Sequence, residues 1–179
     1  MKKLIALLIV VFVCTCQIEV PHPAKVLGFN DIGKKEAVTI AQAEIDRGGW
    51  PEGTTITKAL PIYIEGIDGI SYWECQARAN SKGAGYVLVN ANRTDLVIPE
   101  ASSDDKSLHE VYAAELGTKA FKVVRYDWFR SAAISPEGKV LSSRGMGSDL
   151  AQERKEFLDL LAQRGNNPVH LAGDLNTYY

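Results

Sequence analysis

Residues 70–92 read ISYWECQARANSKGAGYVLVNAN, and the pattern of this stretch decides the fold of the chain. Two runs rich in aromatic and aliphatic residues, 70–78 and 85–92, are separated by NSKG at residues 80–83, a composition typical of a turn. A third run with a period of two, TITKALPIYIEG at residues 55–66, precedes them. Because neighbouring parallel strands need a longer crossover, these short links predict an antiparallel meander.

Three segments outside the meander have the spacing of helices. Residues 34–47 place apolar side chains at helical intervals before a Gly pair. Residues 107–116 contain Ser107 and Glu110 at the spacing of a capping box. Residues 148–164 begin with Ser148 or Asp149 and stop at a glycine. They carry an apolar stripe that needs a partner surface, made of Leu150, Phe157, Leu158 and Leu161. We therefore predict an α+β fold, with an antiparallel β-sheet meander packed with about three α-helices.

A second hairpin is expected between the last two helices. FKVVRYDWFRSAAI at residues 121–134 and KVLSSRG at residues 139–145 flank SPEG, in which Pro presets the backbone and Gly closes a turn. One α+β domain is predicted over residues 33–165, preceded by a tether at residues 17–32. Residues 166–179 lack a clear period and are expected to form a C-terminal tail.

The first sixteen residues, MKKLIALLIVVFVCTC, have the features of an export signal: a basic start, an apolar run and then small or polar residues. The apolar run is about half the length that a transmembrane helix needs, roughly twenty residues. Cys16 is a candidate for lipidation, since Val13 to Cys16 resembles a lipoprotein signal imperfectly, with Thr15 at a position where a smaller residue is usual. Ordinary cleavage nearby is the alternative.

The composition is that of an ordinary folded protein, with 46% hydrophobic and 23% charged residues. The formal net charge is −2, and loss of Lys2 and Lys3 with the export signal makes it more negative. Nucleic acid is not an expected partner, because binding to a phosphate backbone needs a clustered basic surface. A membrane is expected to be contacted only through an N-terminal lipid anchor.

The side chains that carry catalysis in other proteins form no complete motif. Cys75 shares a strand face with Trp73 and Ala77, which predicts a buried structural thiol. His109 and Glu110 begin like a zinc-binding HExxH helix, but position 113 is Ala. His109 is therefore expected to be an exposed residue in the first turn of a helix. We predict no enzyme, no metal site and no cofactor, and a hydrolase that uses Cys75 and a histidine is the minor alternative.

The second strand of the central pair ends in a polar segment. Asn90, Asn92, Arg93, Thr94 and Asp95 interrupt the apolar sequence before it resumes at Leu96. An Asn-rich segment tolerates the backbone angles of a turn or bulge. These five residues are the predicted surface for binding a partner protein.

Residues 69–102, GISYWECQARANSKGAGYVLVNANRTDLVIPEAS, resemble the streptopain-type prodomain, also found as the separate Spi-type inhibitor and ahead of papain-like peptidases. Tyr72 and Trp73 match its aromatic strand, residues 85–87 the start of the next strand, residues 90–92 its polar end, and Pro99 with Glu100 its exit. The likeness extends over about residues 33–145. The peptidase itself has no counterpart, since few residues follow Arg144 and no Gln precedes a Cys-Gly-Pro sequence.

The resemblance implies an exported, non-catalytic protein that binds and inhibits or chaperones a papain-like cysteine peptidase, either lipid-anchored in the cell envelope or secreted. The alternative is a cell-envelope lipoprotein that acts as a binding or structural module with no peptidase partner. A role of either kind needs a rigid surface and no catalytic side chain.

Overall fold

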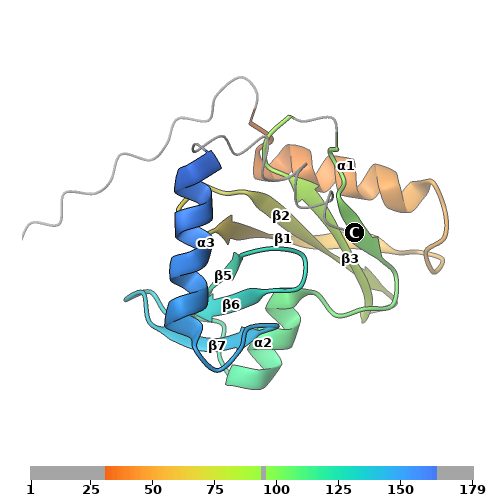
Figure 1. Cartoon of the computed structure of the whole chain (residues 1–179). Helices are drawn as coiled ribbons and strands as arrows, with labels where there is room; N and C mark the ends of the chain where they lie inside the picture. Colours follow the sequence, from red (N-terminus) through yellow and green to blue (C-terminus); the bar gives the residue numbers. More distant parts are fainter. Residues whose placement is uncertain (1–30, 94–95, 165–179) are drawn as a thin grey trace, which may run out of the picture.

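The computed structural model describes residues 31–93 and 96–164. Three helices and seven strands follow one another along this part of the chain (Figure 1). They are α1 (Lys34–Asp46), β1 (Thr55–Ile64), β2 (Tyr72–Ala79), β3 (Lys82–Asn90), β4 (Glu100–Ser102), α2 (Leu108–Leu116), β5 (Lys122–Arg125), β6 (Ser131–Ile134), β7 (Val140–Arg144) and α3 (Leu150–Arg164). The predicted α+β class is confirmed.

All seven strands belong to one sheet, in the order β4-β3-β2-β1-β5-β6-β7. The predicted meander of β1, β2 and β3 is antiparallel, and β5, β6 and β7 form a second antiparallel meander. The two meanders meet through a parallel pair, in which residues 62–64 of β1 lie beside residues 123–125 of β5. Local sequence patterns do not predict this pair, because β1 and β5 are far apart in the sequence and are connected by a crossover that includes α2.

The two meanders have the same order of elements, although their sequences show no repeat. Each begins with a helix, α1 or α2, and continues as three antiparallel strands. Because the first strands of the two meanders are neighbours and run parallel, the meanders extend outward in opposite directions from the centre of the sheet. The helices lie on opposite faces, as the contacts of β2 show below.

Strand β2 has buried side chains on both of its faces. Trp73 and Cys75 point toward α1: the Trp73 Nε1 donates to the Ile32 carbonyl at 2.8 Å, and the Cys75 Sγ lies 3.7 Å from the Ala37 carbonyl oxygen. Glu74 points the other way and contacts His109 of α2. The predicted burial of Cys75 is confirmed, since it is 0% exposed, and burial raises the pKa of its thiol to about 12.

Helix α2 begins where the sequence predicted. The Ser107 side chain accepts a hydrogen bond from the Glu110 amide, the Glu110 carboxylate accepts one from the Ser107 amide, and Gly117 closes the helix in the left-handed conformation. The same helix packs on the second meander, where the Tyr112 hydroxyl lies 2.9 Å from the Ser131 hydroxyl oxygen. This capping box fixes where α2 begins.

Helix α3 buries Phe157 and Leu161 of its predicted apolar stripe. The Phe157 ring meets the Tyr126 ring edge to face, with 5.3 Å between centroids. An ion pair between Arg154 and Glu65, at the end of β1, ties the helix to the sheet. The partner surface that the stripe requires is thus the junction of β1 and β5, although Leu158 remains 39% exposed.

Two expectations about boundaries differ from the structure. Residues 121–134, expected as one strand, form β5 and β6 with a turn between them, in which the Asp127 carboxylate accepts hydrogen bonds from the amides of Phe129 and Arg130. Ile32, placed in the tether, is 2% exposed and donates its amide to the Ala91 carbonyl. The residues that pack in the fold therefore include Ile32. The predicted segments 1–16 and 166–179 lie outside the described residues.

The short edge strand β4 approaches β3 closely at Gly85. A Cβ atom at this position would lie 1.8 Å from the Ser102 carbonyl oxygen, and Gly85 has φ +91. Glu100 of β4 also bonds the Tyr86 hydroxyl and pairs with Arg125 of β5 at 2.9 Å. Because β4 can approach β3 closely at Gly85, the Glu100 carboxylate reaches Tyr86 in the first meander and Arg125 in the second.

Substitution of Gly85 tests this contact, with Gly138 as a matched control. Gly138 has φ +87, and a Cβ atom added there would meet nothing within 4 Å, so Gly138→Ala measures backbone strain alone, about 1–2 kcal/mol. We expect Gly85→Ala to lower the free energy of unfolding by about 1–3 kcal/mol more than the control, because it adds a clash. Urea denaturation measures both values, and equal losses would contradict the close approach.

Candidate functional site

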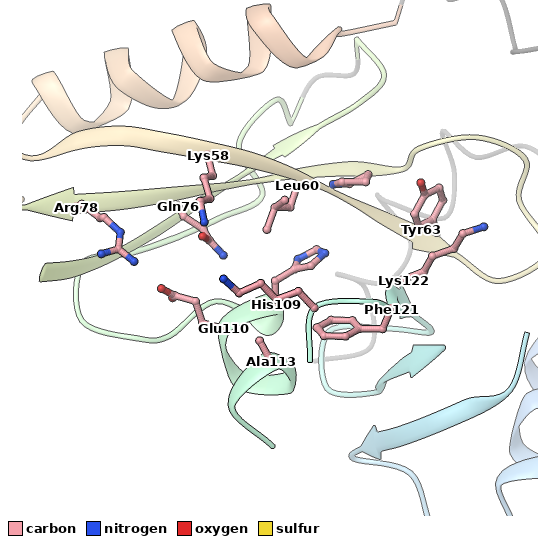
Figure 2. A pocket seen from close by; sticks show the side chains of 12 residues that line it. Lys58, Leu60, Tyr63, Gln76, Arg78, His109, Glu110, Ala113, Phe121 and Lys122 are labelled. Carbon is pink, nitrogen blue, oxygen red and sulfur yellow. The ribbon is translucent and has the colours of Figure 1, made fainter. Parts of the chain in front are cut away.

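A groove lies between the β1–β2 half of the sheet and α2 (Figure 2). It exists because β5 pairs with β1 only along residues 62–64, so the earlier part of β1 has no strand on that side among the described residues. The groove has a volume of about 380 Å³, within the range of ligand sites. It is lined by Lys58, Leu60, Pro61, Tyr63, Gln76, Arg78, His109, Glu110, Ala113, Lys119, Phe121 and Lys122.

A buried acid–histidine pair lies at the base of the groove. The His109 Nδ1 is 3.1 Å from the Glu74 Oε1, and the His109 amide donates to the Glu74 Oε2 at 3.3 Å. The Glu74 side chain is only 1% exposed. A carboxylate in such a place needs several donors, because burial without them is costly.

Helix α2 and β2 supply these donors to Glu74. Burial alone would raise the pKa of this carboxyl, but hydrogen bonds from His109, Ser107 and Gln76, together with the charge of His109, hold it below its ordinary value. The Gln76 Nε2 also donates to the Ser107 hydroxyl oxygen at 3.0 Å. The carboxylate lies at the N-terminus of α2, where the helix dipole favours a negative charge. Glu74 is therefore held ionised as part of the structure.

His109 was predicted to be exposed, and this prediction was wrong. Its side chain is 12% exposed, bound to Glu74 at Nδ1 and stacked on Phe121, with 6.0 Å between ring centroids. The prediction failed because it considered only the position of His109 in the helix, and not the acid that β2 brings to it. The other ring nitrogen, Nε2, is on the far side of the ring from Glu74 and is the one left for a ligand in the groove.

The rim of the groove is basic. Figure 2 shows Lys58 and Arg78 near one end, Lys122 near the other and Leu60 between them. The Arg78 Nη1 donates to the Ser81 carbonyl at 3.0 Å, and the Lys122 Nζ lies 5.6 Å from the centroid of the Tyr63 ring. The groove thus combines an apolar middle with positive charge at its ends.

Among the described residues, those that line the groove include no Ser, Thr or Cys. The nearby Ser107 hydroxyl is 0% exposed and serves as the helix cap, and Cys75 lies on the other face of the sheet. Within the described residues, no group of three or more His, Cys, Asp or Glu side chains could hold a metal ion. The arrangement can bind and polarise a ligand through charge and hydrogen bonds, and it offers no thiol or aliphatic hydroxyl for covalent chemistry.

Three of the predicted partner-binding residues, Asn90, Asn92 and Arg93, are described, and they lie at the far end of β3, away from this groove. Asn90 is 3% exposed, and its Oδ1 accepts a hydrogen bond from the Asn92 amide at 3.1 Å, so it shapes a turn and cannot present its side chain to a partner. Asn92 is half-buried and forms a bridge with Asp31. Arg93 has a 52% exposed side chain paired with Glu36 of α1. Thr94, Asp95 and the lipidation candidate Cys16 lie outside the described residues.

The groove was missed although the sequence carried one signal for it. Glu74 and Gln76 alternate with Trp73, Cys75 and Ala77 in a central strand, so they had to face something other than the apolar core. An inward-facing acid needs donors, and the capping box at Ser107 marks a helix N-terminus that can supply them. The basic residues gave no signal, because they are scattered over positions 58 to 122.

Comparison of the chain with protein-family models, curated proteins and solved structures finds no match. The resemblance to the streptopain-type prodomain therefore depends on the residues quoted for it and stays a prediction. In the part of the chain that the structure describes, no helix is both long and apolar enough to cross a membrane.

Replacing Glu74 with Gln should change how stability depends on pH. A carboxyl whose pKa is lowered by folding stabilises the folded state above its ordinary pKa of 4.5, and this stabilisation is lost as pH falls through the folded pKa. We expect Glu74→Gln to lower the free energy of unfolding at pH 7 by about 1–3 kcal/mol, with a smaller loss below pH 4. Urea denaturation between pH 3 and about pH 8 measures this.

Glu52→Gln is the control, because Glu52 is exposed. It should leave the pH profile unchanged. A difference between Glu74→Gln and the wild type that is constant over the whole pH range would contradict the ionised, donor-bound state of Glu74.

Proposed function

We propose that this protein is an exported, non-catalytic binding protein, lipid-anchored in the cell envelope or secreted. The observation that supports a binding role best is the composition of the groove. The buried carboxylate of Glu74 already accepts hydrogen bonds from α2 and β2, and none of the described lining residues offers a thiol or an aliphatic hydroxyl. Such a site can hold a ligand by shape and charge without changing it.

The partner that we propose is a papain-like cysteine peptidase, which the protein inhibits or helps to fold. The support is the resemblance of residues 69–102 to the streptopain-type prodomain. Those residues include the neighbouring strands β2, β3 and β4, which form one edge of the sheet. A rigid edge of this kind loses little conformational entropy on binding, which favours a tight complex.

Arg93, which follows the end of β3, is the residue that we expect to contact the peptidase. Its ion pair with Glu36 is on the surface, and such pairs contribute at most about 1 kcal/mol to stability. We therefore predict that Arg93→Glu weakens binding to the peptidase at least about tenfold while leaving the free energy of unfolding nearly unchanged. Asn90→Ala should do the reverse, lowering that free energy by about 1–3 kcal/mol, because Asn90 is buried and hydrogen-bonded.

The test uses the full chain and the papain-like peptidase encoded nearest to its gene. Inhibition of hydrolysis of a fluorogenic peptide gives the affinity, and recovery of activity after dilution from urea reports assistance in folding. No inhibition, no binding and no effect on refolding would overturn the peptidase proposal. That result would favour the alternative, a cell-envelope binding or structural module with no peptidase partner.

A further inference from the structure

Basic side chains gather around the groove. Lys58, Arg78, Lys119 and Lys122 all line it, and none forms an ion pair with a described carboxylate. Every other arginine whose side chain is described does form one. In a protein whose formal net charge is −2, four unpaired cations around one groove are a local excess of positive charge.

The acids near the groove offset only part of this excess. Glu110 is the one acidic side chain of the lining, and its carboxylate is held by the Ser107 amide in the capping box. Glu74 lies beneath the lining and is bound to His109. Four cations against these two carboxylates leave the groove with a net positive formal charge, and concave surfaces concentrate the field of such a charge.

The middle of the groove is apolar. Leu60 and Pro61 form one wall, Phe121 lies opposite, and His109 stacks on Phe121. The exposed edge of β1 is not suited to pairing with an added strand. Pro61 has no amide proton to donate, and a lysine on the same strand, Lys58, discourages edge pairing. A ligand must therefore be recognised by apolar contact and by charge.

We propose that this groove binds an amphipathic anion, a molecule with an apolar body and a carboxylate group. The apolar body lies along Leu60 and Phe121, and the carboxylate pairs with a basic end of the groove. Arg78 is suited to this pairing, because one nitrogen of its guanidinium is anchored to the Ser81 carbonyl and the remainder can bind a carboxylate in two places. This binding site is separate from Arg93 and does not depend on a peptidase partner.

The first experiment varies the head group of one apolar chain. Decanoate, decanol and decyltrimethylammonium are titrated separately into the full chain below their aggregation concentrations, with isothermal titration calorimetry and amide chemical shifts as readouts. We expect decanoate to bind at least about tenfold more tightly than the other two and to weaken as salt is raised. No binding of decanoate or of the peptide acid below would overturn the inference, as would equal binding of all three chains.

The second experiment changes the groove itself. Lys58→Glu with Arg78→Glu should weaken anion binding at least about tenfold, whereas the exposed pair Lys35→Glu with Lys139→Glu carries the same change of charge and should not. Ala113→Trp should block the groove, and Ala114→Trp, on the same helix outside the lining, should not. Thermal denaturation checks that each variant folds, and similar effects of the test and control variants would contradict the assignment.

The third experiment separates two sources of the same chemistry. Acetyl-Ala-Ala-Leu is compared as the free acid and as the C-terminal amide, beside decanoate. Binding of the peptide acid but not its amide identifies the end of a peptide as the ligand, and binding of decanoate alone identifies a free organic acid. Binding of decanoate without any binding of the peptidase would overturn only the proposed partner, whereas Arg93-dependent peptidase binding without binding of decanoate or of the peptide acid would overturn only this inference.

Discussion

On one face of the sheet, the position of α2 depends on the buried carboxylate of Glu74. An acid that is 1% exposed in a central strand is tolerated only if several donors meet it. The backbone and ring of His109 are two of them, and Gln76 links the acid to the helix cap at Ser107. Because these donors come from the first turn of α2, they set where that helix lies, and the position of α2 forms one wall of the groove.

The other wall of the groove, β1, is exposed because β1 and β5 pair over only a short length. A parallel pair of only three residues joins β1 to β5, so the preceding part of β1 continues past its neighbour. Helix α1 covers the opposite face of this half of the sheet, and α3 packs at the junction. The face of β1 and β2 toward α2 is thus left partly open, and the repeated helix–meander arrangement explains why a groove occurs at this place.

Local patterns in the sequence were sufficient to predict the helices and strands, but not which of them contact one another. The alternation in residues 70–92, the capping box at Ser107 and the inward position of Cys75 each depend on residues close in sequence, and each is found in the structure. The parallel pair and the contact of His109 with Glu74 join residues far apart, 35 positions in the second case. Asn90 illustrates the same limit, since a polar side chain at a strand end is buried here by its own turn.

Glu74 and His109 act together to hold α2 on the sheet. A double-mutant cycle with Glu74→Gln, His109→Gln and the combined variant measures their coupling by urea denaturation at pH 6. We predict a coupling free energy of about 1–3 kcal/mol, because removing either partner already removes most of what the other contributes to stability. Additive effects of the two substitutions, with a coupling near zero, would contradict it.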